Sequence, residues 1–148
     1  MDIQFVVKGA ATLIKICIVD DEESIRDSLK LYLEEQGHEV KAFVNPLAMV
    51  EHCASCHLQD DPCFDVLFVD QSMAAMTGID FLEHSHDICK LNPDCKFLMS
   101  GALNPQTILR ANALGIRTLQ KPVALNSIDR IVSLVARAKD SPLDDHGR

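Results

Sequence analysis

What this chain has little of narrows its class before any motif is considered. It contains no Trp and only one Tyr, and aromatic residues make up 5% of its 148 residues. Hydrophobic residues nevertheless account for 47% of the chain, and most of them are aliphatic. A core of Val, Ile, Leu and Met is typical of α/β proteins, and a chain of this length predicts one domain.

Basic residues are also few. Lys and Arg together number 14 against 22 Asp and Glu, which gives a formal net charge of −8. Because nucleic-acid binding needs clustered Lys and Arg, this balance argues against a direct nucleic-acid partner. No apolar run approaches the roughly 20 residues that span a bilayer, and residues 1–12 lack the apolar core of a signal peptide. We therefore expect a cytoplasmic protein that does not enter a membrane.

Six cysteines are present, and in the cytosol we expect their thiols to stay reduced. Cys53, Cys56 and Cys63, together with His52 and His57, form what we call the cysteine cluster. Its Cys-x-x-Cys-His spacing is the c-type haem attachment pattern, and the same residues offer zinc ligands or a thiol redox pair. Because the cluster falls in a loop between a helix and a strand, we interpret it as incidental thiols; zinc, redox sensing and haem stay open as alternatives.

Short apolar runs alternate with amphipathic segments over most of the chain. The apolar, β-branched runs predict five strands, at Ile14–Val19, His38–Val44, Asp65–Val69, Lys96–Ser100 and Ile116–Gln120. Apolar residues at helical spacing predict five helices, at Glu22–Gln36, Pro46–Cys56, Gly78–Lys90, Pro105–Leu114 and Leu125–Ala138.

This alternation predicts an α/β fold with a parallel sheet, helices on both faces and right-handed crossovers. We expect the domain to occupy residues 13–138. Residues 1–12 are expected to form a leader, either an extra edge strand or a disordered segment, and the polar residues 139–148 a disordered tail.

Carboxylates follow two of the predicted strands directly. Asp20 and Asp21 close the first strand, and Asp70 closes the third. Because the carboxyl ends of parallel strands meet at one edge of an open sheet, we expect these acids to lie together there. Adjacent carboxylates repel unless a cation lies between them, and Mg²⁺ prefers such oxygen ligands. Each acid by itself also fits a turn or the start of a helix.

Two more polar side chains end the fourth and fifth predicted strands. The hydroxyl of Ser100 can donate to a phosphoryl oxygen, and Lys121 can pair with Asp70 or with the same phosphoryl group. Asp70 is suited to act as a nucleophile that forms an acyl phosphate, with a metal neutralising the charge. Alone, Ser100 fits a helix cap and Lys121 a surface residue; together the set favours phosphoryl chemistry.

These motifs, in this order, resemble the receiver domain of response regulators in two-component signalling, of the stand-alone chemotaxis type. The matching segments are Cys17 to Glu22, Leu67 to Asp70 with Met73 and Gly78 after it, Met99 to Ala102, and Leu119 to Pro122. The resemblance covers about residues 13–138. It implies a flavodoxin-like (βα)5 three-layer sandwich with a five-stranded parallel sheet in the order 2-1-3-4-5.

The resemblance also implies a set of roles. Asp70 would be the phosphoacceptor, receiving its phosphoryl group from a histidine kinase or a histidine phosphotransfer protein. Mg²⁺ would be held by Asp20, Asp21 and Asp70 and by the backbone carbonyl of Ser72. The protein would thus serve a phosphorelay as a phosphoprotein with Mg²⁺ as its cofactor.

Further roles concern the response to phosphorylation. Ser100 and Lys121 would bind the phosphoryl oxygens, and the face formed by the fourth helix, fifth strand and fifth helix would change its affinity for a downstream protein. This is a population shift driven by contacts that only the phosphorylated state makes. The family carries an aromatic switch residue three positions before the lysine, where this chain has Thr118, and a Pro where this chain has Ala74.

Two other functions stay open as alternatives. A receiver that acts as a phosphorylation-independent scaffold would bind Mg²⁺ without gaining a phosphoryl group. An aspartyl phosphohydrolase of the haloacid dehalogenase kind carries its nucleophile in an Asp-x-Asp pattern on the first strand, whereas Asp20 is followed two positions later by Glu22. We therefore expect a phosphoacceptor that is no enzyme beyond its own phosphorylation and dephosphorylation.

Overall fold

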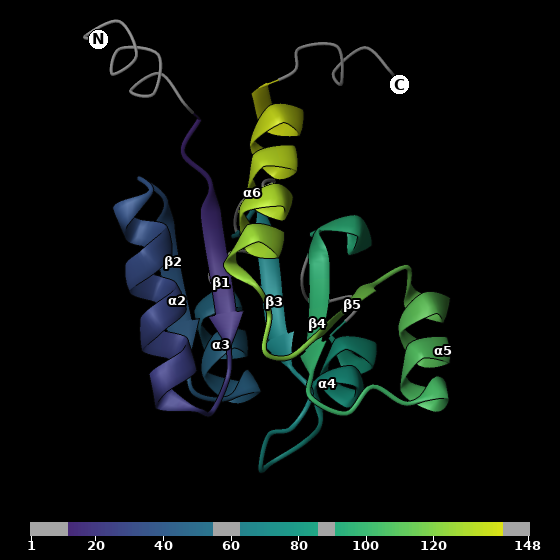
Figure 1. Ribbon diagram of the computed structural model, residues 1–148. Coiled ribbons are helices and arrows are strands. Elements are labelled where there is room, and N and C mark those ends of the chain that lie inside the picture. Colours follow the sequence, from purple (N-terminus) through teal and green to yellow (C-terminus); the bar gives the residue numbers. More distant parts are fainter. Residues whose placement is uncertain (1–11, 55–62, 86–90, 141–148) are drawn as a thin grey trace, which may run out of the picture.

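The computed structural model describes residues 12–54, 63–85 and 91–140. Five parallel strands form one sheet in the order β2-β1-β3-β4-β5 (Figure 1). The strands are β1 (Lys15–Val19), β2 (Glu39–Phe43), β3 (Val66–Asp70), β4 (Lys96–Ser100) and β5 (Arg117–Gln120). This is the predicted fold and strand order, and the predicted strands agree with the observed ones to within one residue at each end.

Helices cover both faces of this sheet (Figure 1). They are α2 (Glu23–Glu35), α3 (Pro46–Cys53), α4 (Gly78–His84), α5 (Pro105–Leu114) and α6 (Leu125–Asp140), with a short 3-10 turn at Pro93–Cys95. Two hydrophobic cores result. One lies under α3, α4 and α5, and the other under α2 and α6.

The three inner strands, β1, β3 and β4, are buried on both faces because their residues alternate between these cores. Cys17 and Val19 of β1 pack beneath α3 and α4, whereas Ile16 and Ile18 pack beneath α2 and α6. A strand covered by helices on both sides needs apolar residues at successive positions. The short β-branched run of β1 meets that need, which is why the sequence identified it as a central strand.

Asn and Pro start two of the helices as the sequence predicts. The Asn45 side chain accepts a hydrogen bond from the Ala48 backbone N–H at the start of α3, and Pro46 follows it. Asn104 caps α5 in the same way through Thr107, with Pro105 next in sequence. Pro is favoured at the first helical position because the N–H that it lacks has no helical partner there.

Three predicted helix ends differ from the structure. Helix α3 ends at Cys53, before the predicted Cys56, and α4 ends at His84 rather than near Lys90; residues 55–62 and 86–90 lie outside the described residues. Helix α6 instead continues two residues past Ala138, into the predicted tail. The Lys139 Nζ donates to the Asp65 carboxylate at 3.0 Å and to the Leu13 carbonyl at 3.3 Å, which holds the last turn against the sheet.

The remaining predictions about the chain ends and the cysteines are tested only in part. Within the described residues no helix is long and apolar enough to cross a membrane. Cys63 is disulfide-bonded, so the expectation that every thiol stays reduced is wrong for this residue. Cys56 and His57 of the cysteine cluster lie outside the described residues, as do residues 1–11 of the leader and 141–148 of the tail.

Candidate functional site

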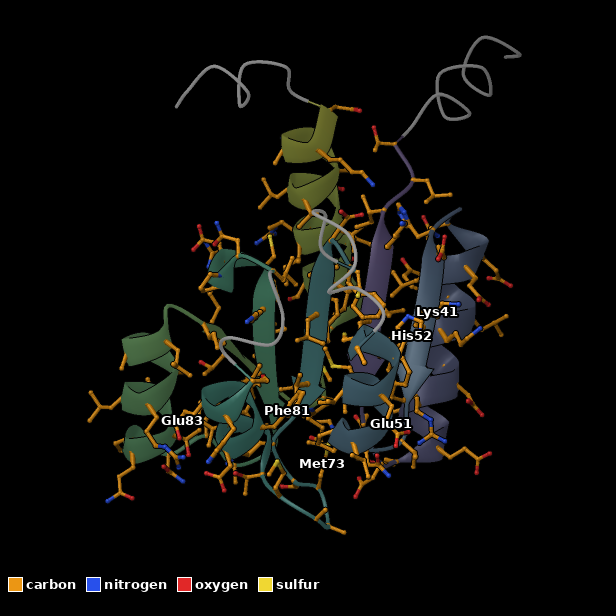
Figure 2. All side chains as sticks on the ribbon, turned by 180° about the vertical axis from the view of Figure 1, so that it is seen from behind. Lys41, Glu51, His52, Met73, Phe81 and Glu83 are labelled. Carbon is orange, nitrogen blue, oxygen red and sulfur yellow. The ribbon has the colours of Figure 1, made fainter. Side chains whose placement is uncertain are left out.

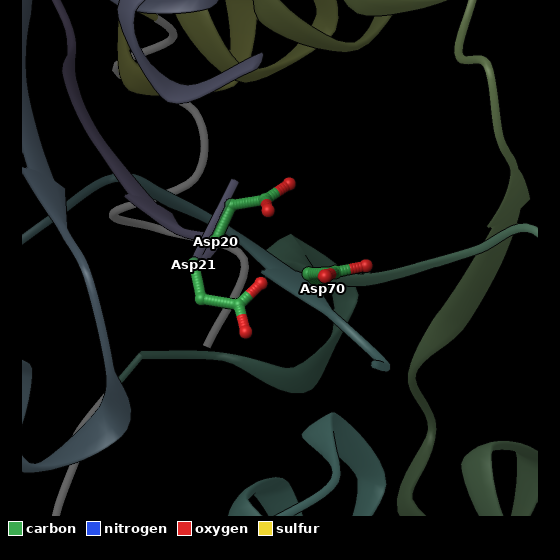
Figure 3. A group of neighbouring side chains, drawn as sticks. All are labelled: Asp20, Asp21 and Asp70. Atoms are coloured by element: carbon green, nitrogen blue, oxygen red, sulfur yellow. The ribbon is translucent and has the colours of Figure 1, made fainter. Parts of the chain in front are cut away.

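Three carboxylates meet where β1 and β3 end (Figure 3). Asp20, Asp21 and Asp70 each place one oxygen within 4.8 Å of the others, and in the described part of the chain they are the one such group of potential metal ligands. Asp20 is fully buried and Asp70 is 4% exposed, whereas Asp21 is exposed to solvent. The side chains therefore form a pocket floor of two buried acids with a third acid at its rim.

Lys121 joins the two buried acids. Its Nζ donates to Asp70 Oδ1 at 3.0 Å and to Asp20 Oδ2 at 3.2 Å. Lys121 follows β5, and the peptide bond that joins it to Pro122 is cis. Its backbone N–H donates to the Ser100 carbonyl at 2.8 Å, which ties the lysine to the end of β4. The sequence predicted the contact with Asp70 and did not anticipate the one with Asp20.

The electrostatics of this group follow from its burial. Burial raises the pKa of the Asp70 carboxyl above its ordinary value, with the negative charge of Asp20 adding to the effect and the hydrogen bond from Lys121 opposing it. Burial by itself would lower the pKa of Lys121, but its bonds and attraction to Asp70 and Asp20 outweigh burial, so the net shift is upward. Two buried acids thus share one ammonium group, which leaves negative charge in excess.

Ser72 and Ser100 lie at the same edge of the sheet. Ser72 lines an open cavity of about 390 Å³ together with Asp21, Asp70 and Lys121, and its backbone contributes a hydrogen bond to the Asp70 carboxyl. Ser100 is the last residue of β4, and its Oγ accepts a hydrogen bond from the Ala102 N–H at 3.1 Å. The hydroxyl group of Ser100 is thus engaged with its own loop.

Thr118, at the position where an aromatic residue was expected by resemblance, is half-buried on the edge strand β5. It lies in register with Leu98 of β4. A threonine side chain lacks the length with which an aromatic ring sweeps between an inward and an outward position. Strand β5 is therefore present at this position, but the large aromatic side chain expected there is absent.

Three residues support the site through contacts that sequence reasoning did not predict. The Arg26 guanidinium donates to the Asp20 carbonyl at 2.9 Å, and the Gln71 side chain accepts from the Ile79 N–H at 2.9 Å. Gly78 packs so closely that a Cβ at this position would lie 2.5 Å from the Asp70 carbonyl oxygen. Helix α4 is therefore braced directly against the residue that ends β3.

This donor set fits a hard divalent cation. Carboxylate oxygens of Asp20, Asp21 and Asp70 converge, and Asp21 and Asp70 line a cavity open to solvent. The exposed Asp21 has no ammonium partner among the described residues. Mg²⁺ is held by one or two carboxylates and keeps several waters, which an open cavity of this size accommodates. The same arrangement leaves Asp70 accessible from the solvent side.

Comparison with known proteins gives a consistent result. A family model described as the response regulator receiver domain matches residues 16–133. A search of curated proteins found no significant match. Among solved structures, a response regulator receiver domain protein from Clostridium thermocellum is 23% identical, with a TM-score of 0.71, covering 86% of this chain and 97% of that one.

Two other similar structures extend the comparison. The Vibrio cholerae chemotaxis protein CheY4 is 25% identical, with a TM-score of 0.63, covering 80% of this chain and 98% of that one. The receiver domain of the Saccharomyces cerevisiae response regulator Ssk1, in a co-crystal with the histidine phosphotransfer protein Ypd1, is 15% identical with a TM-score of 0.73. That alignment covers 90% of this chain and 95% of the yeast chain.

Proposed function

Because this chain belongs to the response regulator receiver domain family of two-component systems, we propose that it accepts a phosphoryl group on Asp70 and signals through protein–protein contacts. The observation that carries this proposal is the bridge from Lys121 Nζ to Asp70 and Asp20, with Asp21 beside them. A buried carboxylate held by one ammonium group and open to solvent on one side is placed to attack a phosphorus atom.

The proposed donor is a phosphohistidine on a histidine kinase or a histidine phosphotransfer protein. An Asp70 carboxylate oxygen would form the new O–P bond while the N–P bond to the histidine breaks, and the imidazole leaves with the bonding electron pair and takes up a proton. Lys121 would hold the transferred phosphoryl oxygens by charge and hydrogen bonds. The similar receiver domain from yeast was solved with a histidine phosphotransfer protein, which supports this partner class.

Asp20, Asp21, Asp70 and the backbone carbonyl of Ser72 would hold Mg²⁺, which when bound offsets negative charge on the carboxylates and the phosphoryl group. Ser100 would bind a phosphoryl oxygen once its Oγ leaves the Ala102 N–H. With Thr118 in place of an aromatic switch, we propose that output to the downstream partner depends on movements of the backbone of β5 and of helices α5 and α6.

The test is phosphorylation by acetyl phosphate with Mg²⁺, followed by intact-mass spectrometry. We expect the wild type to gain one phosphoryl group and Asp70→Asn to gain none, because an amide cannot form the acyl phosphate. Asp27→Asn, which removes an exposed carboxylate on α2, is the matched control and should be phosphorylated as the wild type is. A wild type that binds Mg²⁺ and stays unmodified would favour the scaffold alternative, and turnover of a phosphate monoester would favour the phosphohydrolase.

A further inference from the structure

A second concavity lies on the face of the sheet that α3 and α4 cover. It has a volume of about 360 Å³ and is lined from α3 and its cap by Asn45, Pro46, Leu47 and Val50, and from α4 and the loop before it by Ala75, Met76, Phe81, His84 and Ser85. Figure 2 shows these two helices side by side from behind, with Phe81 in the gap between them. We call this concavity the α3–α4 groove. Its residues are separate from those that hold the carboxylate site.

The size and lining of the α3–α4 groove suit a small molecule. Pockets for small ligands have volumes of about 300–1,000 Å³ and are mostly apolar with a few placed polar groups. Here the base is the buried ring of Phe81, and the rim is formed by Leu47 and Met76, which are 66% and 37% exposed. The groove therefore offers a ligand an apolar base and an apolar rim.

Three polar groups on the groove supply hydrogen-bonding positions. His84 Nδ1 lies 2.7 Å from the Asp80 carbonyl, which only accepts, so Nδ1 donates to it; in the tautomer that this bond favours, Nε2 is an acceptor. Asn45 uses its side-chain oxygen to cap α3 and keeps its amide N–H₂ as a donor. Ser85 is only 4% exposed and places a hydroxyl in the lining. A donor and an acceptor therefore stand on opposite helices.

The charged residues around the groove restrict the charge that a ligand can carry. Helix α3 carries Glu51, and α4 carries Asp80 and Glu83, while neither helix contains Lys or Arg. The Arg110 guanidinium of α5 pairs with Asp80 and Glu83, so one cation offsets part of the charge of these three carboxylates. The whole chain also has a formal charge of −8. This field disfavours an anionic ligand and favours one that is uncharged or cationic.

We propose that the α3–α4 groove binds a small, uncharged or cationic aromatic molecule of two or three rings with one amine or hydroxyl group. The rings would pack on Phe81 between Val50 and Met76, and the polar group would bond to His84 Nε2 or to the Asn45 amide. This is a ligand site distinct from the carboxylate site, and it does not depend on phosphorylation of Asp70.

The experiment uses N-phenyl-1-naphthylamine, an uncharged aromatic amine whose fluorescence rises when it leaves water. A fixed low concentration of this dye is titrated with the full-length protein. We expect saturable binding at one site. Ala75→Trp places a large ring at an exposed loop position on the groove wall and should weaken dye binding by about tenfold or more, which corresponds to about 1.4 kcal/mol.

Four controls make the outcome decisive. Ala113→Trp adds the same ring at an exposed position on α5 and should leave dye binding unchanged. Asp70→Asn should also leave dye binding unchanged, which would show that the groove binds the dye independently of the proposed phosphoacceptor. The anionic dye 8-anilinonaphthalene-1-sulfonate should bind about tenfold more weakly than the uncharged dye because of the acidic surroundings. Urea unfolding of Ala75→Trp, expected to match the wild type, shows that the variant is folded.

Several results would overturn the proposal. Undetectable dye binding by the wild type, or equal binding by Ala75→Trp and the wild type, would mean that the groove is not the site. Stronger binding of the anionic dye would contradict the charge argument. If sedimentation showed that the wild type self-associates and Ala75→Trp does not, a second copy of the chain would be the occupant instead of a small molecule.

Discussion

At the scale of single residues, the site shows a conflict between stability and chemistry. Asp20 and Asp70 are buried acids that share the one ammonium group of Lys121. Burial costs a charged carboxylate its hydration, and one cation offsets only part of this cost. A purely structural site would have replaced one of the acids with an apolar residue. The retained excess of negative charge suits the site to a cation, which under the proposed function would offset that charge when a phosphoryl group is bound.

The close approach of Gly78 to Asp70 gives the first residue-scale prediction. A Cβ at position 78 would lie 2.5 Å from the Asp70 carbonyl oxygen and 2.7 Å from Leu98 Cδ1, and the backbone cannot move away without shifting α4. We expect Gly78→Ala to lower the free energy of unfolding by about 2–3 kcal/mol, measured by urea denaturation. Gly101→Ala is the control, because nothing lies within 4 Å of its Cβ position; equal losses in both variants would show that the contact is not the cause.

His38 gives a prediction about pH. Its Nδ1 accepts a hydrogen bond from the Ile14 N–H at 3.2 Å, which requires the neutral ring, and burial lowers its pKa below the ordinary value of 6.5. The unfolded chain therefore takes up the proton at a higher pH than the folded one, so the stability contributed by His38 is complete above pH 6.5 and is lost as the pH falls toward the folded pKa.

The measurement compares the wild type with His38→Asn, whose side-chain oxygen can accept the same hydrogen bond without titrating. Between pH 7 and pH 5 the wild type should lose more of its unfolding free energy than the variant does. The other histidines are the same in both proteins, so they cancel in the difference. Parallel pH profiles would show that His38 is not the group responsible.

At the scale of secondary-structure elements, ion pairs and hydrogen bonds fix helices to one another. The Tyr32 hydroxyl on α2 donates to the Asp129 carboxylate on α6 at 2.8 Å. On the other face, Arg110 of α5 donates through Nε and Nη2 to both oxygens of Glu83 and through Nη2 to Asp80 on α4. In the part of the chain that the structure describes, helices on each face of the sheet are therefore joined by a polar link in addition to the hydrophobic core.

The link between α4 and α5 is predicted to depend on the shape of the guanidinium group. Arg110→Lys keeps the charge but cannot make the two-pronged bond to Glu83. Because the groups are largely exposed, we expect only a small loss in unfolding free energy. Arg130→Lys, at an exposed position of α6, is the control and should lower the unfolding free energy by less. The difference between the two variants should shrink in 1 M NaCl, where the Debye screening length falls to about 3 Å. A difference that persists in high salt would rule out an ionic origin.

Elements with strong local signals were predictable from the sequence, whereas ends set by distant contacts were not. The run Ile16–Val19 marks a buried strand, and Asn104 with Pro105 marks the start of α5, because both signals are local. Helix α6 continues past Ala138 because Lys139 reaches Asp65, a residue 74 positions earlier. No periodicity in the sequence of α6 itself contains that information.

In the carboxylate site, too, the features set by local signals were predictable and those set by distant contacts were not. The meeting of Asp20, Asp21 and Asp70 was predictable because each acid ends an identifiable strand and parallel strands end at one edge. The bond between Lys121 and Asp20, and the support from Arg26 and Gln71, depend on rotamers and loop paths that spacing does not determine. The disulfide at Cys63 was missed because the expected compartment, rather than geometry, guided that prediction.

At the scale of the whole molecule, the negative net charge and the negative charge of the carboxylate site both lower the stability of the folded state. A formal charge of −8 makes the compact state repel itself, and the site adds a local excess of negative charge at the carboxyl end of the sheet. A cation that binds only the folded chain should relieve both. The folded protein is thus expected to be least stable when divalent cations are absent.

This argument predicts that Mg²⁺ stabilises the protein through the acidic site. At a concentration ten times the dissociation constant, binding should add about 1.4 kcal/mol to the unfolding free energy and raise the melting temperature by about 4 °C, measured by thermal unfolding with and without EDTA. Asp21→Asn should remove most of this gain, since Asp21 is exposed and has no ammonium partner among the described residues. Asp27→Asn removes the same formal charge from α2 and should keep the gain. If both variants lost it equally, the effect of Mg²⁺ would arise from general screening of an acidic chain and not from ligation by Asp20, Asp21 and Asp70.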